Sequence, residues 1–265
     1  MPNLFAQPLN YLLLVFVLFS ASCSKNEPPE TSKFSIEDNT NLGVVIQHEI
    51  SNNSDISILS PKRYPQAYQF IEIRLAEIFN TNEITYTDQY NWSVTIIDND
   101  SIANSFILPG GIIYITSGLL KNYIETTGEF VSILAHEIVY ADRGFVLELL
   151  ETKYSPSSLL DISLGNNPVA AAEIAEFLMV TPYSEESIIE ADRKTCKILC
   201  ASDYNADAYP NFLERLFPDV LIAWTITHPD NGFRITNVKS SLEQPECDGT
   251  ATAASEYENF TSLLP

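Results

Sequence analysis

The stretch from residue 105 to residue 142 constrains the fold most, because two strand patterns lead directly into a long apolar helix pattern. FILPGGIIYIT has apolar and β-branched residues on both sides of a Pro-Gly-Gly break, which is typical of two strands joined by a tight turn. Thr126 or Thr127 is placed to cap a helix that continues through EFVSILAHEIVYAD. These residues predict a small sheet beside a long helix.

The rest of the chain adds few strands and many helices. Apolar residues recur at three- and four-residue spacing in residues 64–80, which indicates an amphipathic helix. NEITYTD and WSVTIID, rich in β-branched residues, are predicted as strands. Further helices are predicted at 143–153, 168–179, 184–201, 206–216 and 232–243. A small N-terminal sheet followed by a mostly helical body makes an α+β domain.

Acidic residues dominate the charge of the chain. There are 35 Asp and Glu residues against 14 Lys and Arg residues, and the net charge is −21. A field of that sign repels nucleic acid and anionic lipid headgroups, so we expect neither as a direct partner. The simplest interpretation is a soluble acidic surface.

Residues 11–23, YLLLVFVLFSASC, form an apolar run that ends in small residues and a cysteine. The run is shorter than the about 20 residues of a membrane span and fits the apolar region of a secretory signal. Ser-Ala-Ser before Cys23 resembles a bacterial lipobox, although Ser20 stands where that box usually has leucine. An ordinary secretory signal cut nearby is the alternative. Both interpretations export the chain, and the first anchors it by lipid in the bacterial cell envelope.

Four segments are expected on this basis. They are a signal peptide at 1–23, a flexible polar tether at 24–42, the folded domain at 43–247 and a C-terminal tail at 248–265.

The cysteines allow one disulfide. If Cys23 is acylated, Cys196, Cys200 and Cys247 remain, and an oxidising compartment permits one pair and leaves one thiol. Cys196 and Cys200 are one helical turn apart and are poor partners for each other. We favour the pair Cys200–Cys247, which fastens the C-terminal end to a helix.

Four motifs follow one another in an order that carries a resemblance. They are NSFILPGGIIYITSGLL, GEFVSILAHEIVYADRG, YSEESIIEADR and THPDNGFRITNV. Together they resemble, over residues 65–243, the HtpX-type and CaaX-prenyl-protease-type zinc metalloendopeptidases, a gluzincin family, and especially its bacterial envelope lipoproteins. The resemblance implies a zincin-like metallopeptidase fold.

The resemblance also implies which residues form the metal site. In that family zinc is held by both histidines of HExxH and by the first glutamate of E-x-E-A-D, and the glutamate of HExxH is the general base. His136 matches the first histidine, and Glu137 matches the general base. Tyr140 stands at the second histidine position and Ile188 at the glutamate position. Asp192 matches a family aspartate that orients the ligands.

Loss of two of the three zinc ligands removes the means of activating a water molecule for peptide hydrolysis. Catalytic zinc is held by three protein ligands, and it lowers the pKa of its bound water from about 15.7 to about 7. A tyrosine ligand must first lose a proton with an ordinary pKa of about 10, and isoleucine cannot ligate. We therefore expect no metal, with Tyr140 and Ile188 packed together in its place. His136 is then a buried hydrogen-bonded histidine, and Glu137 is idle.

A rebuilt zinc site is the alternative. It would combine His136 and Asp192 with Glu185 or with His228 of the THP motif. The chain would then be an active zinc-dependent metalloendopeptidase in envelope-protein quality control. In the family, the THP motif and a downstream arginine, here Arg234, lie near the cleft. These residues fit equally well a turn and a helix start packed on the domain.

The LPGGIIYIT segment has a family role that needs no metal. In the family the strand beside the cleft accepts an extended peptide through main-chain hydrogen bonds. Pro109, Gly110, Gly111 and Ile112 are the predicted peptide-binding positions, although the same residues fit the interior of a sheet equally well. The predicted function is a metallopeptidase-like pseudopeptidase that binds extended protein segments and contacts the membrane through its N-terminal lipid. A purely structural lipoprotein is a third interpretation.

Overall fold

The computed structural model describes residues 34–230, 232–243 and 247–265, which belong to one compact unit, Ser32–Pro265. The predicted signal peptide with Cys23, and the first part of the predicted tether, lie outside the described residues. Within the described ranges, no helix has both the length and the apolar character needed to cross a membrane.

A small sheet of three strands forms from the predicted strand region. β1 (Ser93–Ile97), β2 (Ser105–Leu108) and β3 (Ile112–Thr116) lie in the order β1-β3-β2. β3 is therefore the middle strand, and it pairs parallel with β1 and antiparallel with β2. Every residue of β2 and β3 is buried.

The turn between β2 and β3 contains the Pro-Gly-Gly break. Gly110 and Gly111 both have positive φ, 75° and 96°, which glycine adopts without steric cost. A Cβ on Gly110 would come within 2.6 Å of the Cα of Thr40, and a Cβ on Gly111 within 2.6 Å of the Trp92 ring. Both glycines are thus required by backbone conformation and by close packing.

The helix that carries the His-Glu pair is buried along its whole length. α4 (Thr127–Asp142) has only buried residues, and it packs against β2 and against α8 (Glu185–Cys200). Thr126 caps α4, because its hydroxyl accepts a hydrogen bond from the main-chain N–H of Glu129 at 3.2 Å. A helix with no exposed face is surrounded by other elements of the fold.

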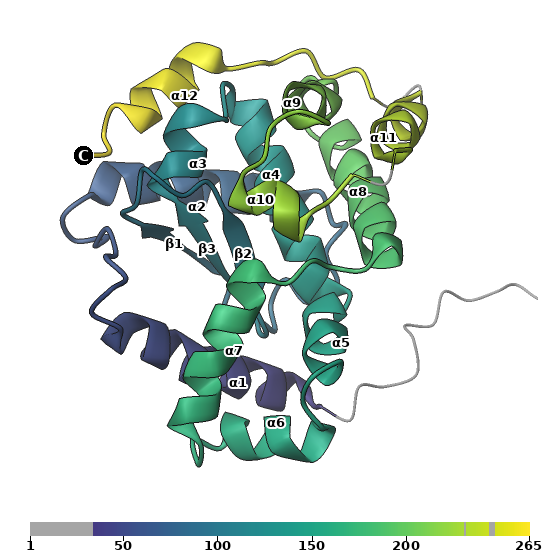
Figure 1. Ribbon diagram of the computed structural model, residues 1–265. Helices are drawn as coiled ribbons and strands as arrows, with labels where there is room; N and C mark the ends of the chain where they lie inside the picture. The colour runs from purple at the N-terminus through teal and green to yellow at the C-terminus, as the bar shows by residue number, and fades with distance from the viewer. Residues whose placement is uncertain (1–33, 231, 244–246) are drawn as a thin grey trace, which may run out of the picture. The chain divides into compact units, whose positions relative to one another are not determined.

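Helices make up most of the remaining described chain (Figure 1). They are α1 (Ile36–Asn52), α2 (Pro65–Asn80), α3 (Ser117–Asn122), α5 (Phe145–Glu151), α6 (Pro156–Ser163), α7 (Pro168–Val180), α9 (Ala208–Leu216), α10 (Ala223–Thr227), α11 (Arg234–Leu242) and α12 (Ala254–Thr261). α11 packs on α8 and α9, and α9 packs on α4. The predicted α+β fold, a small sheet with a mostly helical body, is confirmed.

α1 corrects the predicted tether, which was expected to extend to residue 42. Ser35 and Asp38 form a capping box in which each side chain accepts the main-chain N–H of the other residue. Leu42, Ile46 and Ile50 follow at four-residue spacing and are at most 1% exposed. The polar residues between them concealed this apolar face in the sequence.

α12 corrects the predicted tail in the same way. It packs on α2 and α4, and its Tyr257 and Phe260 are 2% and 1% exposed. The hydroxyl of Tyr257 donates to the carbonyl of Leu120 at 2.7 Å. The folded unit therefore includes the C-terminal segment.

The predicted strand NEITYTD (residues 82–88) is wrong, because residues 85–89 form turns. The carboxylate of Asp142, at the end of α4, accepts the main-chain N–H groups of Thr85 and Tyr86 at 2.7 and 2.9 Å. These donors bind a side chain, so they are not available to a neighbouring strand.

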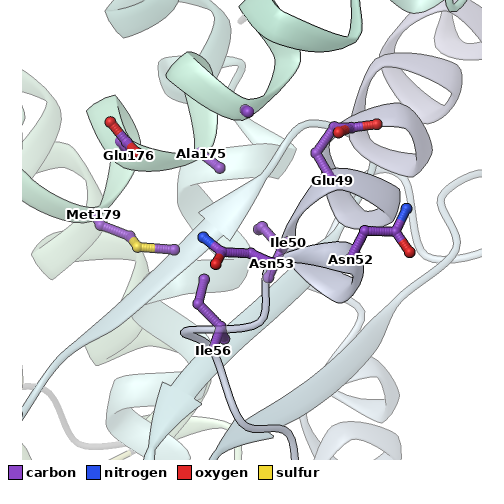
Figure 2. A pocket seen from close by; sticks show the side chains of 9 residues that line it. Glu49, Ile50, Asn52, Asn53, Ile56, Ala175, Glu176 and Met179 are labelled. Atoms are coloured by element: carbon purple, nitrogen blue, oxygen red, sulfur yellow. The ribbon is translucent and has the colours of Figure 1, made fainter.

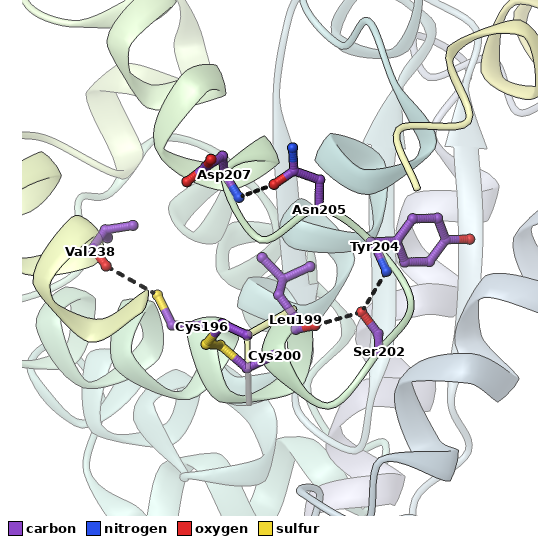
Figure 3. Close-up of a disulfide and its surroundings, with 9 residues drawn as sticks. Cys196, Leu199, Cys200, Ser202, Tyr204, Asn205, Asp207 and Val238 are labelled. Atoms are coloured by element: carbon purple, nitrogen blue, oxygen red, sulfur yellow. Dashed lines mark hydrogen bonds between the residues drawn. A yellow bond between two sulfur atoms is a disulfide. The ribbon is translucent and has the colours of Figure 1, made fainter. Parts of the chain in front are cut away.

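A disulfide joins Cys200, at the end of α8, to Cys247 (Figure 3). Cys196 lies one turn earlier on α8 as a buried free thiol, with its Sγ 3.8 Å from the carbonyl oxygen of Val238. Burial raises the pKa of the Cys196 thiol to about 12.

Candidate active site

His136 lies at the centre of a buried polar cluster. Its side chain is 1% exposed, and its Nδ1 is 3.1 Å from the hydroxyl of Tyr209 and 3.2 Å from Oδ1 of Asp192. Its Nε2 is 3.1 Å from the hydroxyl of Tyr140, one turn later on α4. These partners assign the proton of a neutral His136 to Nδ1, so that Nε2 accepts a hydrogen bond from Tyr140.

Arg234 and Asp192 form a buried ion pair beside His136. Nε of Arg234 is 2.8 Å from Oδ2 of Asp192, and Nη2 is 2.9 Å from Oδ1. Nη2 also donates to the hydroxyl of Tyr209 at 2.9 Å and lies 3.5 Å from Nε2 of His136. This two-bond arrangement fixes α11 to α8 and places a positive charge next to the histidine.

The electrostatic surroundings keep His136 uncharged. Burial is the main cause that holds the pKa of His136 well below its usual value, followed by the positive charge of Arg234 and by His228. Burial alone would lower the pKa of Arg234, but Asp192, Tyr209 and Tyr140 together outweigh burial and raise that pKa. Arg234 and Asp192 therefore form a charged pair in direct contact with an uncharged His136.

Tyr140 is packed as an aromatic core residue. It is fully buried, and its ring is stacked on Tyr183 with the centroids 3.8 Å apart and the planes at 9°. Its ring is perpendicular to that of His136, at 86°. Burial raises the pKa of Tyr140 well above its usual value, although Arg234 opposes that rise. Tyr140 is therefore a neutral phenol rather than the phenolate that metal ligation needs.

Glu137 contacts β2 and His228, the residue that follows α10. Its Oε1 accepts a hydrogen bond from Oγ of Ser105 at 2.5 Å and is 3.4 Å from Nε2 of His228. The His228 ring is stacked on Trp224 with the centroids 4.7 Å apart. Within the described residues, Oε2 of Glu137 has no hydrogen-bond partner. The family's general base is thus held in a closed, fully buried position.

The ligand position on α8 is apolar. Ile188 is 2% exposed and lies one turn before Asp192. Glu185, the substitute considered in the alternative, is exposed on the first turn of α8, whereas His136 and Asp192 are buried. Tyr140 and Ile188 are both buried, and their direct packing against each other stays a prediction.

These side chains do not fit a zinc ion. Zinc would require the Nε2 lone pair that Tyr140 uses, and it would lie close to the guanidinium of Arg234. Neither Tyr140 nor Ile188 can replace the missing anionic or imidazole ligand. Among the described residues, no group of three His, Cys, Asp or Glu side chains has a metal-binding arrangement.

The predicted peptide-binding strand has no open edge in this structure. β3 is paired on both sides, and β2, the outer strand, is at most 2% exposed at every residue. On the other side of the sheet, main-chain bonds join residues 57–59 to residues 96–98 and cover the end of β1. Pro109, Gly110 and Gly111 form the buried turn that α1 covers. Ile112 begins β3, which is paired on both sides, so the described part of the chain does not support binding of an extended segment at this position.

Several members of the cluster were not identified from the sequence. Ser105 and Tyr183 lie within two of the motif segments but had no role assigned to them, and Tyr209 lies outside all four segments. Their proximity to Glu137, Tyr140 and His136 arises from tertiary packing. Arg234 and His228 were noted only through their family positions. One signal for Tyr209 is its place in α9, whose apolar face packs on α4.

A buried helix with a His-Glu pair, facing an aspartate on a second helix beside a small sheet, defines a metallopeptidase-like scaffold. The chain belongs to peptidase family M48, because the sequence model of that family matches residues 69–242.

Relatives agree with this membership. The chain is 27% identical over 150 residues to the mitochondrial metalloendopeptidase OMA1 of Arabidopsis thaliana, covering 55% of this chain and 30% of that protein. It is 23% identical over 171 residues to the beta-barrel assembly-enhancing protease of Escherichia coli (strain K12), covering 56% and 34%. It is 25% identical over 181 residues to the human mitochondrial metalloendopeptidase OMA1, covering 59% and 33%. The chain thus spans about a third of the length of these relatives.

Proposed function

We propose that this protein is a non-catalytic member of peptidase family M48. The observation that carries the proposal is the hydrogen bond of Tyr140 to Nε2 of His136, the nitrogen that would bind the metal. Tyr140 cannot be removed from this contact without also losing its stacking on Tyr183. The retained pair of His136 and Glu137 therefore contributes packing and hydrogen bonds, and the fold is kept without peptide hydrolysis.

Two further features support the same proposal. The ligand position on α8 is occupied by a hydrocarbon, Ile188, so that no carboxylate is available there. The fixed cation of Arg234, 3.5 Å from Nε2 of His136, disfavours a second cation at that nitrogen. The alternative, an active zinc-dependent metalloendopeptidase, would have to displace Tyr140 and accommodate Arg234.

Hydrolysis of a denatured protein tests the proposal. Wild type and Glu137→Gln are incubated with unfolded casein, with and without added zinc, and the fragments are quantified by mass spectrometry. We expect both proteins to give the same background, because Glu137 has no metal-bound water to activate. Cleavage by wild type that Glu137→Gln abolishes would show a working peptidase and contradict the proposal.

We also propose that the protein is exported and lipid-anchored through Cys23 in a bacterial cell envelope. The support is the sequence of residues 11–23 and the similarity to relatives that include the beta-barrel assembly-enhancing protease. In a bacterial host fed labelled palmitate, wild type should become labelled and enter the membrane fraction. Cys23→Ser should do neither. Equal labelling of the two would exclude Cys23 as the anchor.

Binding of protein segments is part of the proposed function, but the closed sheet does not support it at residues 109–112. A partner surface must therefore be sought elsewhere on the domain.

A further inference from the structure

A hollow with a volume of about 410 Å³ lies between α1 and α7, apart from the His136 cluster (Figure 2). Its floor is apolar and formed by Ile50 and Ala175, which are 1% and 5% exposed. Ile56 and Met179 are half-buried at its sides. The hollow therefore offers a contact for a large apolar side chain.

Two carboxylates flank this apolar floor, Glu49 from α1 and Glu176 from α7 (Figure 2). The only ionic contact of Glu49 within the described chain is with the ring of the adjacent His48, which is itself exposed. Glu176 is exposed and has no hydrogen bond or ion pair with any described residue. Both carboxylates are thus available to a cation from outside the domain.

The two helices that form the hollow carry no Lys or Arg of their own. Residues 34–61, which include α1, contain no Lys or Arg, and neither do residues 154–192, which include α7. Glu37, Asp38 and Glu173 add negative charge on the same two helices. The net charge of −21 increases the attraction for a basic partner during encounter.

We propose that this hollow is a docking site for a protein segment that carries a large apolar side chain next to Lys or Arg. The apolar side chain would cover the floor at Ile50 and Ala175, and the basic side chain would pair with Glu49 or Glu176. A small cation alone would leave the apolar floor exposed, and among the described residues the two carboxylates belong to no metal-binding group.

This docking site does not depend on the fate of the metal site. None of the side chains that form it belongs to the His136 cluster, so zinc uptake and peptide hydrolysis can be measured independently of docking.

Fluorescence anisotropy of a labelled peptide tests the site on the purified full chain. The probe is Gly-Lys-Phe-Leu-Lys-Gly, and the matched peptides are Gly-Glu-Phe-Leu-Glu-Gly and Gly-Lys-Gly-Gly-Lys-Gly. We expect saturable binding of the probe with Kd below about 1 mM, and binding at least about tenfold weaker for each matched peptide.

Three variants test whether the probe peptide binds in the hollow. Glu49→Gln with Glu176→Gln should weaken the probe about fivefold, as expected for the loss of exposed ion pairs. Ala172→Phe, on the wall of the hollow, should fill it and weaken binding at least about tenfold. Glu258→Gln, an exposed carboxylate on α12, is the control and should bind like wild type.

Several results would overturn the proposal. The first is a probe peptide that does not saturate by about 1 mM, and the second is equal binding of the acidic peptide. The third is unchanged binding of the probe by the Glu49→Gln, Glu176→Gln variant when circular dichroism shows that this variant is folded. The charge variant changes no packed apolar group, so the test does not depend on Ala172→Phe folding.

Discussion

Tyr140 stacks on Tyr183, with ring centroids 3.8 Å apart, while its hydroxyl hydrogen-bonds Nε2 of His136. The side chain at the second ligand position is therefore an aromatic core residue with one polar contact. This arrangement separates two contributions of Tyr140 to stability, its ring and its hydroxyl.

Replacement of Tyr140 should show both contributions in urea unfolding. Tyr140→Phe keeps the ring and loses the hydroxyl, so we expect the free energy of unfolding to fall by about 1 kcal/mol. Tyr140→Ala also removes the stacked ring and leaves a cavity, so we expect a fall of about 3–5 kcal/mol. Equal effects of the two variants would mean that the stacking on Tyr183 contributes little.

Arg234 and Asp192 should be strongly coupled. Arg234→Met leaves the carboxylate of Asp192 buried without a counter-charge, and we expect a loss of about 3–5 kcal/mol in the free energy of unfolding. Asp192→Leu should destabilise by a comparable amount, but the double variant should lose much less than the sum of the two. Additive losses in the double-mutant cycle would contradict a buried ion pair between them.

Restoring the lost ligands should restore zinc binding. Tyr140→His with Ile188→Glu adds the imidazole and the carboxylate that the family positions require, next to the existing His136. Calorimetric titration with zinc should show about one ion bound per double-variant chain, and none for Tyr140→His alone. A folded double variant that takes up no zinc would contradict the assignment of the ligand positions.

The thiol of Cys196 should be unreactive in the folded protein. Burial raises its pKa to about 12, so almost no thiolate is present at pH 8, and the side chain is 1% exposed. In the Cys23→Ser variant, a disulfide-exchange reagent should label no thiol in buffer and one thiol in denaturant without reductant. Rapid labelling under native conditions would contradict the packing of α8 against α11.

The sequence was most informative where a local rule acts directly on the backbone. The Pro-Gly-Gly turn, the Thr126 cap and the apolar α4 predicted the centre of the fold. α1 and the segment around Thr85 were mispredicted, because polar composition and β-branched residues were considered without their tertiary partners.

The candidate site, too, could be predicted only where a short sequence motif places a residue. The motifs placed His136 and Glu137 on one helix and Asp192 on a second helix, where each position is fixed by its local sequence. The contacts of Tyr183 and Tyr209 depend on segments more than 40 residues away from His136 in the chain, and no local pattern encodes such contacts. The burial of the outer strand β2 could likewise not be predicted from the sequence, because it results from the packing of α1 and α7 against that strand.

The zinc content of the wild-type protein tests the central claim most directly. The protein is dialysed against zinc and then against metal-free buffer, and its zinc is measured by elemental analysis beside a His136→Asn variant. We predict that wild type retains no more zinc than His136→Asn does, because Tyr140 occupies Nε2 of His136 and Ile188 provides no ligand. Near-stoichiometric zinc in wild type that His136→Asn loses would contradict the account and point to a rebuilt metal site.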